Sequence, residues 1–188
     1  LKVAVTDYNP EAEGMLLADY PIEVSTRNIN LTVNTAKQFH RSCPLDGVMT
    51  VGTDASQTVA AVADALGILG IPFEVAERAT DKIKMRQVLQ EKGVPVPKFR
   101  PIWTLEEGQD ALKHMALPLV IKPCDNMGAR GVRKIERHDD LIPAFREAKE
   151  ASISGKLIVE EFMAGPELSL DALVFEGSIH IPGIADRI

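Results

Sequence analysis

Cysteine is scarce in this sequence. Of its 188 residues only Cys43 and Cys124 are cysteines, which are too few and too far apart for a disulfide framework or a zinc site. The four histidines are scattered without the spacing of metal ligands, so we assign none of them to a metal. Reduced thiols in a cytoplasmic protein are therefore the expectation.

Long apolar runs and an excess of positive charge are missing as well. No run approaches the roughly 20 apolar residues that span a bilayer, and the first seven residues resemble a strand rather than a signal peptide. The 21 basic residues face 27 acidic ones, and this net charge of −6 argues against a general nucleic-acid surface. Local basic residues such as Lys82, Lys84 and Arg86 could still hold a small anion. We expect neither a membrane nor a nucleic acid as a partner.

The first half of the chain alternates short apolar segments with amphipathic ones. The pattern predicts strands at 2–6, 22–25, 47–51 and 71–74, with helices at 11–18 and 31–40 and a third after Asp54. Strands that alternate with helices of this length indicate a parallel sheet built from crossover units. We expect an α/β, Rossmann-like domain over residues 1–79.

From residue 80 onward the pattern becomes α+β. Thr80-Asp81 can cap a helix that ends at Gly93, and Thr104 to Glu107 has the spacing of a capping box. A further helix is expected after Asp139, followed by strands at 157–162, 167–175 and 178–184. The segment divides into two small units, residues 98–156 and 157–188.

Residues 117–132 carry the clearest chemistry. The apolar run Leu119 to Ile121 predicts a buried strand that places Lys122 at its end, and a loop with Gly128 and Gly131 then turns the chain back. Such a loop lets backbone N–H groups approach phosphate oxygens without a Cβ in the way, while the lysine adds a point charge. Taken alone, a Lys-Pro step before a glycine turn is more often a surface hairpin.

Three motifs in this order resemble the ATP-grasp superfamily. They are Asp-Lys at 81–82 followed by Gly-Val-Pro-Val-Pro at 93–97, Val-Ile-Lys-Pro with its glycine loop at 120–131, and Val-Glu-Glu-Phe-Met-Ala-Gly-Pro-Glu at 159–167. The resemblance implies an incomplete α+β ATP-grasp domain over 80–188, with a lid at 98–156 and the start of the second grasp subdomain at 157–188. Residues 1–79 resemble the α/β domain that precedes the grasp, without its first strand. We therefore expect a piece of a longer protein.

The resemblance assigns phosphate contacts to the first two motifs. Lys82 and Lys122 match the two basic positions at the ATP phosphates, and the loop Gly128–Gly131 matches the flap that covers them. Arg130 is either an additional anion contact or a surface group.

The third motif matches the part of the site that holds the nucleoside. Glu160, Glu161, Phe162 and Met163 match the linker whose backbone reads adenine, and Glu167 matches the acid that binds the ribose hydroxyls. A carboxylate can accept from two hydroxyls, and apolar side chains suit the edge of a base. Since neighbours in a strand point to opposite faces, one of the two linker glutamates should be exposed.

The resemblance implies a ligase that joins a small carboxylate to an amine or ammonia through an acyl phosphate, with ATP and Mg²⁺ as cofactors. The magnesium ligands of this superfamily are expected beyond residue 188, and no Ser or Cys nucleophile is expected. Within the superfamily the chain looks closest to the large subunit of carbamoyl-phosphate synthase, and a homodimer is left open. The alternatives are a non-catalytic ATP-binding module and an NAD(P)-dependent oxidoreductase in which Asp7 binds a ribose.

Overall fold

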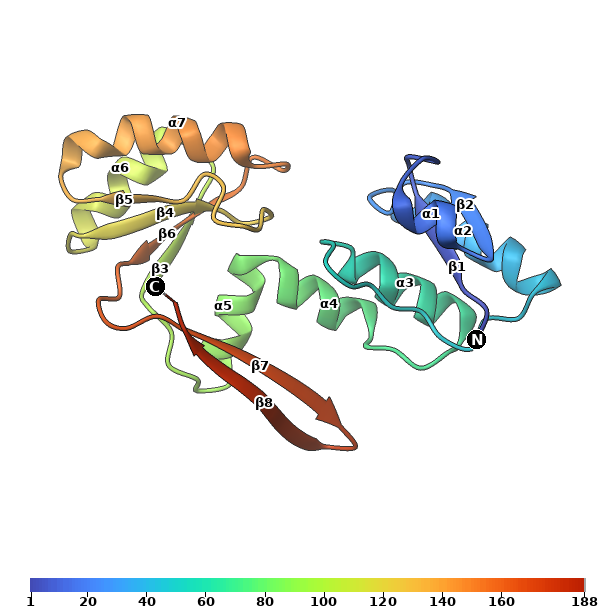
Figure 1. Ribbon diagram of the computed structural model, residues 1–188. Coiled ribbons are helices and arrows are strands. Elements are labelled where there is room, and N and C mark those ends of the chain that lie inside the picture. The colour runs from blue at the N-terminus through green and yellow to red at the C-terminus, as the bar shows by residue number, and fades with distance from the viewer. Residues whose placement is uncertain (188) are drawn as a thin grey trace.

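The computed structural model describes residues 1–187. Figure 1 shows a small N-terminal unit and the four-stranded sheet at opposite ends, with the helices of residues 56–91 in a row between them. In chain order the first elements are β1 (Ala4–Asp7), α1 (Glu13–Leu17), β2 (Tyr20–Glu23), α2 (Ile29–Ser42), α3 (Ser56–Leu66), α4 (Phe73–Thr80) and α5 (Lys82–Glu91). The remaining elements are β3 (Phe99–Ile102), α6 (Leu105–His114), β4 (Leu119–Pro123), β5 (Arg133–Ile135), a 3₁₀ turn at His138–Asp140, α7 (Leu141–Ala151), β6 (Leu157–Glu161), β7 (Leu168–Phe175) and β8 (Ser178–Asp186).

The N-terminal sheet is smaller than the sequence predicted. Strands β1 and β2 pair in parallel, but in the described residues they are the whole of this sheet. The predicted strand at 47–51 is wrong, because these residues are irregular and no described strand lies beside them to pair with. The predicted strand at 71–74 is also wrong: Pro72, with its φ of −56°, stands at the start of helix α4. In the described residues the N-terminal unit thus consists of one parallel pair of strands and its helices, and the Rossmann-like sheet stays a prediction.

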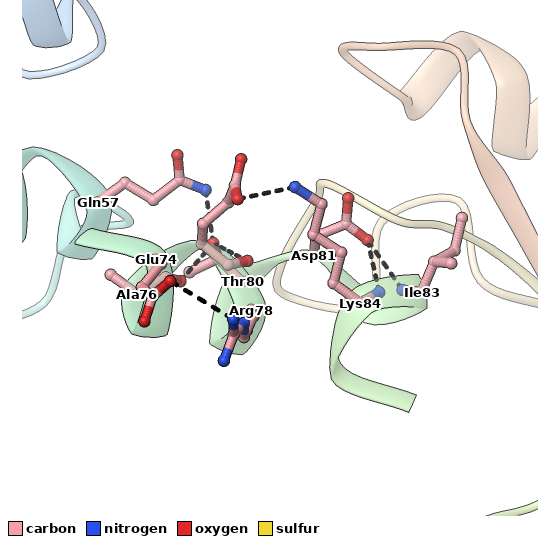
Figure 2. Close-up of polar contacts among 9 residues, drawn as sticks. Gln57, Glu74, Ala76, Arg78, Thr80, Asp81, Ile83 and Lys84 are labelled. Atoms are coloured by element: carbon pink, nitrogen blue, oxygen red, sulfur yellow. Dashed lines mark hydrogen bonds and ion pairs between the residues drawn. The ribbon is translucent and has the colours of Figure 1, made fainter. Parts of the chain in front are cut away.

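Helices α4 and α5 meet at a sharp junction that polar side chains define (Figure 2). Asp81 caps α5 by accepting hydrogen bonds from the backbone N–H groups of Ile83 at 2.9 Å and Lys84 at 3.2 Å. Thr80 closes the last turn of α4 by donating to the carbonyl of Ala76, and it accepts a hydrogen bond from the side chain of Gln57. This junction places Lys82 in the first turn of α5.

The four-stranded antiparallel sheet has the order β3-β6-β4-β5. The sequence predicted β4 and β6 within a residue or two of their ends, but it predicted no strand where β3 lies. Pro101 sits inside β3, which is possible because β3 is an edge strand of the sheet.

The two faces of this sheet have different roles. On one face α6 and α7 cover a core in which Leu119, Ile121 and Val159 are fully buried. The predicted capping box of α6 is present: Thr104 accepts from the N–H of Glu107, and Glu107 accepts from the N–H of Thr104. The other face packs against α5 through a smaller cluster, which consists of Ile83, Phe99, Cys124 and Ile158.

The last two strands form a hairpin that projects from the rest of the chain (Figure 1). Strands β7 and β8 pair in an antiparallel register with an irregularity between Asp171 and Leu173, and every residue of both strands is exposed. The sequence predicted both strands, and Glu176 and Gly177, both with a positive φ, form the turn between them.

Candidate functional site

Strand pairing brings Lys122 and Glu160 to the same face of the sheet. Lys122 stands opposite Ile158 in the β4–β6 register, so Glu160, two residues further along β6, is its diagonal neighbour. The Lys122 ammonium lies 2.6 Å from Glu160 Oε2, and only 17% and 5% of the two side chains are exposed. This is the sheet face against which α5 packs.

Lys82 reaches the same region from the first turn of α5. Its backbone N–H donates to the carbonyl of Cys124, and its ammonium donates to the carbonyl of Asn126. Burial lowers the pKa of Lys82, and the positive charge of Lys122 lowers it further. Both predicted phosphate lysines therefore lie where α5 packs on this sheet face, and the charge of Lys122 acts on Lys82.

The glycine loop is fastened at its base and open at its tip. The side chain of Asn126 donates to the carbonyl of Ala151 at 2.7 Å, and Asp125 accepts from the hydroxyl of Ser152 and the N–H groups of the next two residues. Burial alone would raise the pKa of Asp125, but these hydrogen bonds outweigh it and lower the pKa below its ordinary value. The loop thus has one fixed geometry where it leaves β4.

Gly128 and Gly131 differ in their surroundings although both have a φ of +69°. A Cβ at Gly131 would stand 2.6 Å from the Cβ of Ala151 and 3.1 Å from the Cγ of Pro123, whereas a Cβ at Gly128 would meet nothing within 4 Å. Gly131 therefore allows a close approach between loop and α7, while Gly128 allows the turn alone.

Arg130 does not join the two lysines. Its Nε donates to the carbonyl of Met127 at 3.1 Å, and its Nη2 lies 3.9 Å from the carboxylate of Asp54, with most of the side chain exposed. In this arrangement Arg130 connects the loop to the segment before α3.

The linker residues at the end of β6 and just after it have separate environments. Glu161 is exposed and accepts from the N–H of Lys98, so of the adjacent glutamates Glu160 is the buried one. Phe162 donates its N–H to the carbonyl of Pro118, and the ammonium of Lys134 lies 4.4 Å from its ring centre. Met163 is 68% exposed, so the linker presents an apolar side chain at the surface.

Glu167 lies at the start of the projecting hairpin. Its Oε1 accepts from Arg187 at 2.7 Å, and both side chains are about two-thirds exposed. The structure does not bring Glu167 into contact with the lysines.

The sequence indicated Arg86 only as a local basic residue that could hold an anion, and it did not predict its contact with Glu160. Its Nε donates to Glu160 Oε1 at 2.8 Å, so Glu160, assigned to the linker, has its side chain bound by two cations. The available signal was the spacing of four residues from Lys82, which puts Arg86 on the same side of α5.

One family of known proteins matches this part of the chain. The model of the ATP-grasp domain matches residues 79–186, which is more than half of the chain. The chain belongs to the ATP-grasp family.

Solved structures of ATP-grasp proteins share its fold. An L-amino acid ligase from Bacillus licheniformis is 25% identical with a TM-score of 0.80, and the match covers 99% of this chain and 44% of that one. The biotin carboxylase domain of a Hydrogenobacter thermophilus 2-oxoglutarate carboxylase, solved with MgADP, ADP and bicarbonate, is 19% identical (TM-score 0.76; 99% and 45% covered). N5-carboxyaminoimidazole ribonucleotide synthetase from Thermus thermophilus is 21% identical (0.73; 99% and 48%). The chain spans less than half the length of these proteins.

The described part of this ATP-grasp chain does not fit a magnesium site on its own. Within residues 1–187 no group of three or more His, Cys, Asp or Glu side chains could hold a metal ion. The nearest carboxylates to the lysines are also engaged, since Glu160 pairs with two cations and Asp125 with hydroxyl and N–H donors. The predicted magnesium ligands fall outside the described residues.

Two further properties bear on the chemistry of the chain. Burial raises the pKa of Cys124 to about 12, so this thiol stays protonated and is a poor nucleophile. None of the helices within residues 1–187 has the length and apolar character required to cross a membrane.

The buried carboxylate should make stability depend on pH in acid. Burial by itself would raise the pKa of Glu160, but hydrogen bonds from Arg86 and Lys122 outweigh it and hold the pKa below its ordinary value of 4.5. A folded-state pKa below the unfolded one means that the stabilisation is complete above about pH 4.5 and is lost as the pH falls through the lowered value.

We expect this part of the acid loss to disappear in the Glu160→Gln variant. Urea unfolding between about pH 6 and pH 3 should show a shallower decrease in the free energy of unfolding for the variant than for the wild type. An equal slope in both proteins would show that other carboxylates cause the acid loss.

Proposed function

We propose that the chain is the ATP-binding part of a ligase that joins a small carboxylate to an amine or ammonia. The observation that carries this proposal is the convergence of Lys82 and Lys122 at the base of a glycine loop, in a chain of the ATP-grasp family. Two partly buried ammonium groups beside a glycine loop suit a polyphosphate, whose charge is spread over many oxygens.

The rest of the nucleotide would extend from the lysines toward the linker. Glu161 ends the strand that carries Glu160, and Phe162 and Met163 follow it, with partly exposed apolar side chains that suit an adenine edge. Glu167 can bind ribose hydroxyls if it exchanges its exposed pair with Arg187, which is worth at most about 1 kcal/mol. Gly128 and Arg130 stand at the open tip of the loop, where they can close over the phosphates.

In the proposed reaction the carboxylate attacks the γ-phosphorus of ATP and expels ADP. The acyl phosphate then reacts at its carbonyl carbon with the amine, which loses a proton and releases inorganic phosphate. The lysines contribute by holding the phosphates and offsetting their charge, so the chemistry needs no protein nucleophile. Mg²⁺ would bind together with residues outside the described part of the chain.

The identity of the carboxylate substrate is proposed from similar proteins. The L-amino acid ligase suggests an amino acid as the acceptor. A reaction like that of carbamoyl-phosphate synthase would instead use bicarbonate and ammonia. Both acceptors pass through an acyl phosphate, so one assay can compare them.

We further propose a domain boundary near residue 80. There α4 ends, and Asp81 caps the helix that carries the first site lysine. Residues 1–79 then form the preceding α/β domain, and residues 80–188 the incomplete grasp with its units at 98–156 and 157–188. The two unpaired cysteines suit a reducing compartment such as the cytoplasm.

The test is transfer of oxygen from the carboxylate to phosphate. The full-length protein, incubated with MgATP, an amine and an ¹⁸O-labelled carboxylate, should release ADP and inorganic phosphate that contains one ¹⁸O atom. The acceptors to compare are the common L-amino acids and bicarbonate, the latter with ammonia. Binding of ATP without any turnover would identify a non-catalytic binding module, and failure to bind ATP would refute the nucleotide site itself.

A further inference from the structure

Arg86 forms a largely buried ion pair between α5 and the sheet. Its Nε lies 2.8 Å from Glu160 Oε1, its Nη2 lies 3.4 Å from Oε2, and only 17% of its side chain is exposed. The pair joins residues that are 74 positions apart in sequence, so it links two separate elements, α5 and β6. Arginine forms such two-point contacts through its planar fork, which lysine lacks.

The carboxylate of Glu160 is divided between two cations. Arg86 Nε pairs with Oε1, and the Lys122 ammonium pairs with Oε2 at 2.6 Å. One carboxylate cannot neutralise two cations, so the cluster of these three side chains keeps a net positive charge. In a partly buried setting that surplus acts on a nearby anion more strongly than it would in water.

Arg86 also fixes the helix that carries Lys82. The two residues are four positions apart on α5, so their side chains leave the helix on the same side, one turn from each other. The contact between Arg86 and β6 therefore orients the turn from which Lys82 reaches the loop.

We propose that Arg86 is a positioning residue for the phosphate site, which presupposes the proposed function. By sharing Glu160 it prevents a one-to-one neutralisation of Lys122, and by anchoring α5 it keeps Lys82 beside the loop. Without Arg86, Glu160 would pair with Lys122 alone, and the positive charge offered to a polyphosphate would fall.

The first test compares ligands with and without phosphates in the Arg86→Met variant of the full-length protein. Calorimetric titration should show that ATP affinity falls by about tenfold or more, because the cluster beside the phosphates loses its net positive charge. Adenosine, which has no phosphate, should bind within about threefold of its wild-type affinity. The matched control is Arg78→Met. Arg78 and Glu74 form an exposed ion pair within α4, the helix before α5, so this variant should leave both affinities unchanged.

The second test asks whether Arg86 acts through Glu160. In a Glu160→Gln background the loss of ATP affinity caused by Arg86→Met should be smaller than in the wild type, since no carboxylate remains to neutralise Lys122. Arg86→Lys, which keeps the charge but loses the two-point contact, should weaken ATP binding less than Arg86→Met does. Thermal unfolding monitored by circular dichroism confirms that each variant is folded.

The outcomes separate this inference from the proposed function. If the wild type does not bind ATP, the proposed function fails. If the wild type binds ATP, three results would refute the role of Arg86. Arg86→Met could bind ATP as tightly as the wild type, or its affinity for adenosine could fall as much as its affinity for ATP. The third is an equal loss of ATP affinity in the wild-type and Glu160→Gln backgrounds. Should Arg86→Met not fold, Arg86→Lys decides, because an equal loss for ATP and adenosine in that variant contradicts the proposal.

Discussion

Replacing Lys122 with alanine should weaken ATP binding by about 10- to 100-fold in the full-length protein, which corresponds to one charge-assisted hydrogen bond of about 1.5–3 kcal/mol. The substitution removes the ammonium and also exposes the phosphates to the Glu160 carboxylate, which adds repulsion. The fold should persist because Glu160 keeps its contact with Arg86. Titration with ATP measures the effect, and Lys82→Ala should act in the same direction.

Lys84 supplies the matched control for both lysines. It stands on the same helix as Lys82, but its ammonium pairs with Glu77 at 2.7 Å, and 40% of each side chain is exposed. Lys84→Ala should therefore change ATP affinity by less than about twofold, as expected for an exposed pair. The phosphate clamp would be refuted if Lys122→Ala and Lys82→Ala behaved like this control.

Replacing Gly131 with alanine should lower the free energy of unfolding by about 2–4 kcal/mol. Part of the loss is the cost of a Cβ at positive φ, about 1–2 kcal/mol, and the rest is the collision with Ala151 and Pro123. Both neighbours belong to packed elements, so neither can move away without disturbing others. Urea unfolding measures the change.

Gly128→Ala separates the two contributions. Gly128 has the same φ as Gly131, but a Cβ there meets nothing within 4 Å, so only the backbone cost of about 1–2 kcal/mol should appear. If both variants lowered the free energy of unfolding equally, the close approach between the loop and α7 would not contribute to the effect of Gly131→Ala.

Features with local signals could be predicted from the sequence. The capping box at Thr104, the cap at Asp81 and the strand that carries Lys122 near its end depend on residues within a few positions of one another. The family followed from three such local motifs taken in order, and the family model bears it out over residues 79–186.

Features that depend on distant partners could not be predicted in the same way. Residues 47–51 have a strand-like composition, but a strand also needs a neighbour, and the described chain provides none there. Strand β3 was missed because Pro101 argues against a strand until its edge position is known. The contact between Arg86 and Glu160 arises only when α5 packs on the sheet, which no local pattern reports.

The cap at the start of α5 has a consequence for how this end of the helix can attract anions. The amide of Lys82 donates to the carbonyl of Cys124, and those of Ile83 and Lys84 donate to Asp81. These groups would otherwise form the positive pole of the helix dipole, a common binding point for anions. On the proposed function, attraction of the phosphates to this end of α5 would thus come from side-chain cations rather than from the helix dipole, and it would decrease as ionic strength rises.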